Sequence, residues 1–186
     1  MFSNQLFEGQ SIYLTAIDIE TDPVIESEWT RNLDYTRKFH EEPAHPLAVF
    51  ELKKNYQEQL KHADETRSEF YFAIHEKISE NLVGFIRIPN IYWSNRGSDL
   101  IISMNDHEQK AIYEREALNL ALNFIFRELN LNRVSIVTAE YDAEAVSLYE
   151  GAGFILEARR RDAVYSGGRH WAVLHFGMLS VEWEKN

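Results

Sequence analysis

The sequence of 186 residues contains no cysteine. This absence excludes a disulfide framework, a thiolate zinc site and a cysteine nucleophile. No stretch approaches the roughly 18 consecutive apolar residues that a membrane-spanning helix requires. The opening residues MFSNQLFEGQSIYL contain no basic segment followed by an apolar run, so nothing marks the chain for export and we expect a cytoplasmic protein.

Positive charge is scarce as well. The chain has 19 Lys and Arg residues against 30 Asp and Glu residues, which gives a formal net charge of −11. Phosphate backbones and anionic lipids attract proteins of the opposite charge, so we expect neither a nucleic acid nor a membrane as partner. A metal site is not predicted either, because no paired ligand spacing connects His40, His45, His62, His75, His170 and His175.

Apolar residues, in contrast, make up 45% of the chain, which is enough to bury a sizeable core. The sequence shows no internal repeat, no low-complexity tract and no linker rich in Pro, Gly or Ser. A single domain covering residues 1–186 is the simplest interpretation.

Hydrophobic periodicity predicts strands and helices in a mixed order. The order is a strand in QSIYLTAI, helices in PVIESEWTRNL and PLAVFELKKNYQEQLKHA, an antiparallel hairpin of FYFAIHE and NLVGFIRIP, and a third strand in GSDLIISM. A helix with one buried stripe follows from Ile112, its apolar positions being Leu118, Leu122, Ile125, Phe126 and Leu129. The last third predicts a strand in RVSIVTAE, a short helix from an Asp142 N-cap to Gly151, and two strands joined by an SGGR turn.

Several of these segments together resemble the GNAT acetyltransferases, in particular the branch that acetylates the N-terminal amines of ribosomal proteins. The resemblance rests on GFIRIPNIYWSNRGSDLIISM, on REAL near the start of the long helix, on FRELNLNRVSIVTAEYDAEAVSLYEGAGF and on DAVYSGGRHWAVLHFGMLSVEW. Its most specific part is AVSLYEGAGFILEARRRDAVYSGGR. It implies an α/β (α+β) GNAT fold: a mixed, mostly antiparallel central sheet, splayed between its two central parallel strands, with helices on both faces.

The resemblance also implies acetyl-CoA as donor and a primary amine as acceptor, either a small amine or a protein N-terminus, and it leaves a homodimer open. The cofactor would lie where the strands LIISM and VSIVTAE part. Backbone groups of Ile102, Ser103 and Met104 would there bind the pantetheine amides as an added strand would.

Glycine is missing from the segment that should bind the pyrophosphate. The family pattern Gln/Arg-x-x-Gly-x-Gly/Ala falls on Gln109, Lys110, Ala111, Ile112, Tyr113 and Glu114, with Arg115 next, and no glycine lies between Gly97 and Gly151. Ile112 is penalised at positive φ, and a Glu114 carboxylate would oppose the phosphate charge. Two interpretations stay open: an ordinary helix start, or an altered loop that holds CoA through Lys110, Arg115 and the remaining N–H groups.

Tyr149 matches the family's tyrosine, whose hydroxyl donates toward the CoA sulfur, and its alternative role is packing under the sheet. Asp99 lies where the family often has a glutamate beside the acceptor, and it could accept an amine proton through water. Its alternative is a solvated carboxylate at a strand end. Asp142 replaces an asparagine near CoA, and Ala172 replaces a frequent aspartate.

Other candidates have simpler explanations. His107 is a candidate base, but it belongs to a polar loop, where a histidine is usually just exposed to solvent. Tyr92 and Trp93 could form either the wall of an acceptor pocket or part of the core. The run Arg159–Arg161 suits an acidic ligand, an adenosine 3′-phosphate or a solvated strand edge. Two functions therefore remain in play: an acetyl-CoA-dependent N-acetyltransferase, or a GNAT-derived module that has lost the cofactor and acts as a binding or regulatory protein.

Overall fold

The computed structural model describes residues 6–39, 44–105 and 108–185. Its contacts divide the chain into two compact units, which are described separately below. Unit 1 comprises Met1–Pro89 and Ile101–Asn123, and unit 2 comprises Asn90–Leu100 and Phe124–Asn186. A single domain for residues 1–186 stays a prediction.

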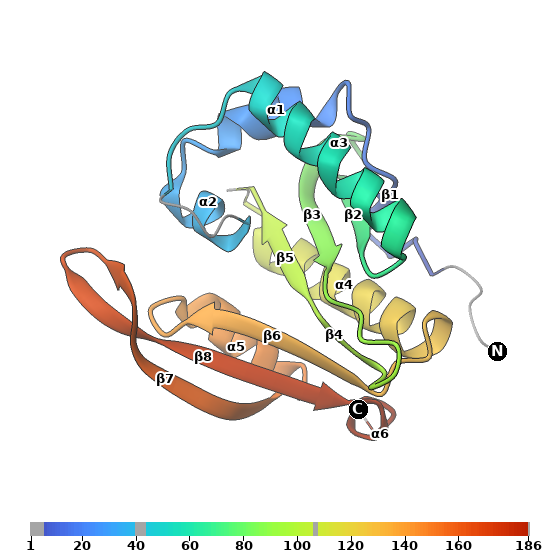
Figure 1. Cartoon of the computed structure of the whole chain (residues 1–186), viewed down its shortest axis with the longest axis vertical. Coiled ribbons are helices and arrows are strands. Elements are labelled where there is room, and N and C mark those ends of the chain that lie inside the picture. The colour runs from blue at the N-terminus through green and yellow to red at the C-terminus, as the bar shows by residue number, and fades with distance from the viewer. Residues whose placement is uncertain (1–5, 40–43, 106–107, 186) are drawn as a thin grey trace. The chain divides into compact units, whose positions relative to one another are not determined.

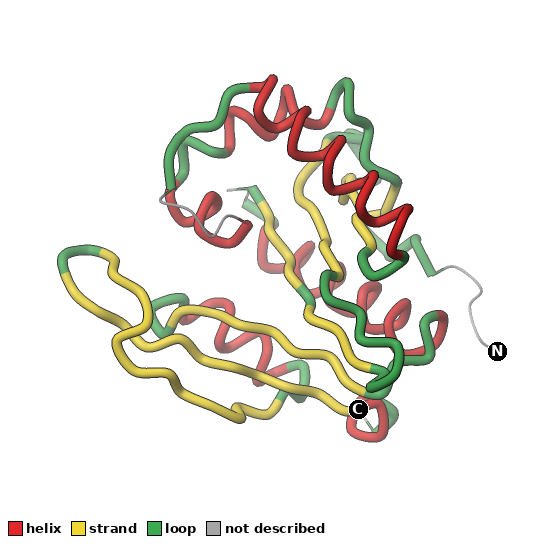
Figure 2. Tube along the Cα trace, viewed as in Figure 1, coloured by secondary structure: helices red, strands yellow, loops and turns green. Residues whose placement is uncertain are grey.

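Unit 1 is built on a four-stranded antiparallel sheet in the order β1-β2-β3-β5 (Figure 1). Its strands are β1 (Ile12–Thr15), β2 (Phe70–Glu76), β3 (Leu82–Ile88) and β5 (Ile101–Met104). Its helices are α1 (Asp22–Trp29), α2 (Leu33–Phe39), α3 (Val49–Thr66) and α4 (Lys110–Asn123). Helix α3 lies in front of this sheet and α4 behind it in the views of Figures 1 and 2.

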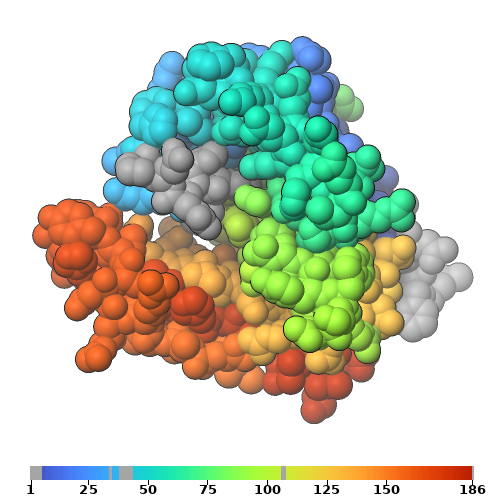
Figure 3. Space-filling model, in the orientation of Figure 1, coloured from blue at the N-terminus to red at the C-terminus, as the bar shows by residue number. Residues whose placement is uncertain are grey.

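The layer between α3 and the sheet forms one part of the core. Tyr56 of α3 packs with Ala73, Leu82 and Phe85 of the β2–β3 hairpin, and Trp29 of α1 joins them. At the start of α3, the Glu51 carboxylate accepts the Ala48 N–H at 2.8 Å, which satisfies a donor that the helix itself cannot bond. The outer side of α3 forms part of the surface of unit 1 in Figure 3, where it is drawn in turquoise.

Unit 2 is built on a second four-stranded sheet in the order β4-β6-β8-β7. Its strands are β4 (Gly97–Asp99), β6 (Arg133–Ala139), β7 (Ile155–Ser166) and β8 (Arg169–Leu179), and its helical segments are the π-helical turn η1 (Phe124–Glu128), α5 (Ala143–Gly151) and α6 (Ser180–Trp183). β4 runs parallel to β6, and the other pairs are antiparallel. Alternate residues of β8 are buried, which identifies the covered face; they are Ala172, Leu174, Phe176 and Met178.

Local predictions with a clear mechanism are confirmed. FYFAIHE and NLVGFIRIP pair as an antiparallel hairpin, and Asp142 caps α5 by accepting the Ala145 N–H at 3.1 Å. The SGGR turn joins β7 to β8, with Gly167 and Gly168 at φ values of 60° and 81°. Two consecutive positive φ angles favour glycine, since residues with a Cβ atom are strained there.

Three predictions about the elements are wrong. GSDLIISM forms two strands, because Asp99 pairs with β6 whereas Ile101 pairs with β3. The additional helix α2, at seven residues, is too short to show a reliable period. The helix expected from Ile112 begins at Lys110, and its buried face is broader than the predicted stripe. The buried residues are Tyr113, Glu114, Ala117, Leu118, Leu120, Ala121 and Leu122.

Among the helices in the described ranges, none combines the length and the apolar character required to cross a bilayer.

Candidate functional site

The backbone changes its hydrogen-bonding partner at Leu100. The Leu100 N–H donates to the Ser135 carbonyl at 2.9 Å, directly after the three residue pairs that join β4 to β6. The next residue, Ile101, pairs with Arg87 of β3. Within the described residues, β5 and β6 therefore belong to two different sheets, as the resemblance predicts for LIISM and VSIVTAE.

β5 is held closely against β3. Ile102, Ser103 and Met104 are 4%, 0% and 5% exposed. A Cβ atom on the opposing Gly84 would lie 2.5 Å from the Ser103 carbonyl oxygen, which is closer than real Cβ contacts. The Ser103 hydroxyl and the Asn105 side-chain oxygen are buried, and within the described residues neither has a hydrogen-bonding partner. Unused hydrogen-bonding capacity of this kind in a buried site is typical of a place where a polar ligand binds.

The predicted pyrophosphate segment is helical. The N–H groups of Ile112 and Tyr113 both donate to the Gln109 carbonyl, at 3.0 and 3.1 Å, so they belong to the first turn of α4. Ile112 is 59% exposed, whereas Glu114 is only 5% exposed. This geometry favours the interpretation of an ordinary helix start at these positions. Lys110 and Ala111 form the first two positions of the helix.

Two side chains of α4 attach its first turns to the sheet of unit 1. The Tyr113 hydroxyl donates to Glu76 of β2 at 2.9 Å, and burial together with this carboxylate raises the pKa of Tyr113. Glu116 accepts the N–H of Ser11 at 3.0 Å, just before β1. Tyr113 therefore faces the sheet, and Arg115, which is exposed, is the cation of this turn that lies on the surface.

The catalytic candidates Tyr149 and Asp99 both lie in unit 2. Tyr149 is 5% exposed, and its ring centroid lies 6.0 Å from that of Phe154 and 6.0 Å from that of Phe176. These contacts support its packing role and leave the role of its hydroxyl as a prediction. Asp99 is half-buried and accepts a hydrogen bond from the Asn90 amide at 3.0 Å.

The other candidates lie at the surface or form ion pairs within the chain. Tyr92 and Trp93 are 56% and 48% exposed, so they do not belong to the core. Arg159 forms a bidentate pair with Glu140, whereas Arg160 and Arg161 are exposed on the edge strand β7.

Ala172 and His107 are the last two candidates. Ala172 is buried, and its carbonyl accepts the Glu140 N–H at 2.9 Å. His107 lies outside the described residues. Within those ranges, no three side chains of the metal-ligating types come together.

Sequence reasoning missed a buried carboxylate in α1. Glu26 is 2% exposed and accepts hydrogen bonds from the hydroxyls of Tyr35 at 2.9 Å and Tyr56 at 2.6 Å. Burial raises the pKa of Glu26 to about 7, although the two hydroxyls act in the opposite direction. The available signal was weak: acidic residues at positions 22 and 26 share one face of a helix.

Comparison with protein families identifies the class of this fold. Residues 26–173 match the model described as Acetyltransferase (GNAT) domain, and the chain belongs to this family. Known structures support the same fold. A spermidine N-acetyltransferase from Vibrio cholerae in complex with CoA and spermine superposes with a TM-score of 0.80 at 24% identity, over 95% of this chain and 99% of that one.

The sequence relatives include N-acetyltransferases with different named substrates. A putative ribosomal N-acetyltransferase, YdaF of Bacillus subtilis strain 168, is 30% identical over 56% of this chain and 57% of that protein. A spermidine N(1)-acetyltransferase of Vibrio cholerae serotype O1 is 27% identical over 58% of this chain and 62% of that protein. The chain thus spans somewhat over half the length of these two relatives. A third, the SPbeta prophage-derived uncharacterized N-acetyltransferase YokL of Bacillus subtilis, is 24% identical over 96% and 95%.

Proposed function

We propose that this protein is an acetyl-CoA-dependent N-acetyltransferase that acts on a primary amine. The observation that carries the proposal is the change of partner at Leu100, where one continuous strand run leaves β6 and joins β3. The chain belongs to the GNAT family, and at this break the amide groups of the cofactor can form hydrogen bonds with the protein backbone as an added strand would.

The residues of β5 suit the pantetheine arm of acetyl-CoA. The buried Ser103 hydroxyl and the Asn105 side-chain oxygen offer one donor and one acceptor that the described residues do not use, and an extended amide chain needs such partners. The N-terminus of α4 would lie toward the pyrophosphate, with Lys110 and Arg115 as its cations. When bound, acetyl-CoA supplies an acetyl group activated as a thioester.

Two side chains of the protein would then donate and accept the protons that acetyl transfer requires. The amine must be neutral to attack, and the departing sulfur must be stabilised or protonated. The Tyr149 hydroxyl is the proposed donor toward the sulfur. Asp99 is the proposed acceptor for the amine proton through a water molecule, with Asn90 fixing one of its oxygens at 3.0 Å.

The acceptor is proposed as a primary amine, a class that includes the polyamine and the protein N-terminus that the names of relatives indicate. A homodimer and a cytoplasmic location stay predictions from the sequence. The comparisons give no support to the non-catalytic alternative.

Calorimetric titration of acetyl-CoA into the purified protein tests the proposal, with desulfo-CoA, which lacks the thiol, as a probe of the pantetheine and phosphate contacts. We expect saturable binding of both. Release of CoA thiol in the presence of spermidine or an N-terminal peptide should then be detected. Binding without turnover on any primary amine would favour the non-catalytic alternative, and absence of binding would refute the role of the Leu100 break.

A further inference from the structure

Helix α1 buries two of its three acidic side chains and exposes its aliphatic ones. Asp22 and Glu26 are 3% and 2% exposed, whereas Val24 and Ile25 are 50% and 41% exposed. Burial of an ionised carboxylate is costly, and burial of Val or Ile is favourable. An arrangement opposite to both preferences is expected where a function requires it.

The Glu26 carboxylate retains capacity for a further donor. Each of its oxygens accepts one tyrosine hydroxyl, Tyr35 on one and Tyr56 on the other, and an ionised carboxylate offers about four acceptor positions. No Lys, Arg or His of the described residues forms an ion pair with it. Asp22, one turn earlier, adds a second buried negative group.

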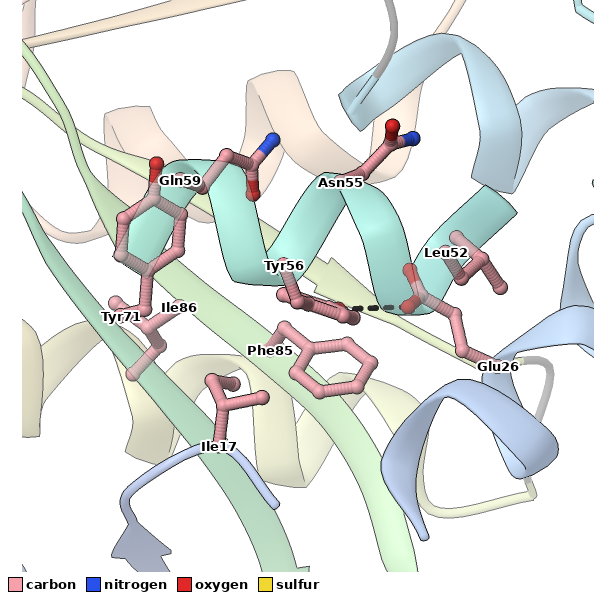
Figure 4. A pocket seen from close by; sticks show the side chains of 9 residues that line it. All are labelled: Ile17, Glu26, Leu52, Asn55, Tyr56, Gln59, Tyr71, Phe85 and Ile86. Carbon is pink, nitrogen blue, oxygen red and sulfur yellow. Dashed lines mark hydrogen bonds between the residues drawn. The ribbon is translucent and has the colours of Figure 1, made fainter. Parts of the chain in front are cut away.

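Glu26 lines a pocket with aromatic walls. The pocket lies between α1, α3 and the β2–β3 hairpin, and its free volume of about 20 Å³ has room for a group about the size of one water molecule, such as an ammonium head group. Figure 4 shows the Glu26 carboxylate directed toward the Tyr56 hydroxyl, with the ring of Phe85 beside Tyr56; the two ring centroids are 5.9 Å apart. The residues that line it are Ile17, Glu26, Leu52, Asn55, Tyr56, Gln59, Tyr71, Phe85 and Ile86.

We infer that this pocket, here called the Glu26 pocket, binds the ammonium group of a small alkylamine. A buried carboxylate that no cation of the described residues pairs with, next to aromatic faces, matches an ammonium group in charge and in size. The alkyl part would contact Ile17, Leu52 and Phe85. The choice of an amine rests on the proposed function, whereas the charge of the ligand follows from the pocket itself.

The chemistry also says which nitrogen would bind. An amine paired with a buried carboxylate stays protonated, because the opposite charge favours its cationic form. A protonated nitrogen has no lone pair with which to attack a thioester. The Glu26 pocket therefore takes a nitrogen that is not acetylated.

Titration of the full chain with propylammonium, followed by two-dimensional NMR of the backbone amides, tests the inference. We expect saturable shifts for amides of α1 and α3, and no such shifts with 1-propanol, which has a similar size and no charge. Glu26→Gln should weaken binding at least about tenfold, because it removes the charge and keeps the shape. Glu28→Gln is the matched control: Glu28 lies on the same helix, is exposed and pairs with Arg31, so this variant should bind as the parent does.

The pH dependence of binding by the parent protein is a second test, and it does not depend on whether the variant folds. Since Glu26 binds as a carboxylate and burial raises its pKa to about 7, the affinity of the parent should rise about tenfold from about pH 6 to about pH 8. The profile of the Glu26→Gln variant shows any pH dependence that comes from other groups, such as Asp22, whose pKa burial raises. The other groups near Glu26 are tyrosines whose pKa burial raises, and which stay neutral here; they are Tyr35, Tyr56 and Tyr71.

The outcomes separate the two proposals. Equal shifts with 1-propanol, a flat pH profile of the parent or absence of binding would each overturn the Glu26 pocket, even where acetyl-CoA binds and turns over. Propylammonium binding with the expected pH profile would support the pocket, even where acetyl transfer fails.

Discussion

Replacement of Glu26 by Gln should change how the stability of the protein depends on pH. The carboxyl group has a pKa of about 7 in the folded protein, against 4.5 as its ordinary value. Between these two values the folded state holds a proton that the unfolded state has released. The stabilisation from this group is therefore present below about pH 4.5 and is lost as the pH rises through about 7.

The size of the effect follows from the two pKa values. With one proton involved and 1.36 kcal/mol per pKa unit, the free energy of unfolding should fall by about 2.5 kcal/mol at this site between about pH 5 and about pH 8. The Glu26→Gln variant cannot titrate and escapes this loss. Its amide group must find an acceptor in place of a carboxylate oxygen, which costs about 1–3 kcal/mol at every pH.

Urea unfolding of both proteins across this pH range measures the difference directly. We expect the free energy of unfolding of the variant, minus that of the parent, to rise by about 2.5 kcal/mol over the range. Subtraction removes the other titrating groups, such as Asp22, whose pKa burial raises, and Glu157, whose pKa Arg133 lowers. If the two curves run parallel, Glu26 is already ionised in the folded protein and the argument from burial is wrong.

Three other changes test the proposed site. Tyr149→Phe should lower kcat about 10²-fold with little change in unfolding, measured by steady-state kinetics and thermal melting, and an unchanged kcat would assign the residue to packing. The double change Ile112→Gly and Glu114→Gly should tighten binding of both CoA and dephospho-CoA by roughly tenfold to a hundredfold in calorimetry, and should lower stability by about 2 kcal/mol; equal affinities would show that these residues do not limit binding. Gly84→Ala should destabilise the protein by about 1–3 kcal/mol in urea and weaken CoA binding, because its Cβ atom would meet the Ser103 carbonyl oxygen; a variant that melts like the parent would contradict this close approach.

The parts of the fold that local chemistry determines could be predicted from the sequence. Asp142 caps a helix, and two glycines form the turn between β7 and β8, because each residue acts on neighbours within three or four positions. The pairing of FYFAIHE with NLVGFIRIP follows from two apolar runs with a short polar turn. The likeness of the tyrosine helix and the final hairpin to the family completed the assignment.

Features that depend on distant contacts could not be predicted in this way. The strand GSDLIISM reads as continuous, yet it breaks at Leu100 because Ser135 and Arg87 pair with successive parts of it. Glu26 looks like a surface residue of a charged helix. Its burial depends on Tyr56, which lies thirty positions further along the chain.

The order in which unit 1 becomes complete has a consequence for synthesis on the ribosome. Its sheet needs β5, and its back face needs α4, but both follow the Asn90–Leu100 segment that belongs to unit 2. A nascent chain that ends at Leu100 therefore presents β3 as an open edge, with apolar side chains such as Ile86 and Ile88 on it. Exposed strand edges of this kind recruit other strands. Co-translational folding of unit 1 should thus wait until Asn123 has left the exit tunnel, and a pause in translation just before β5 should favour aggregation.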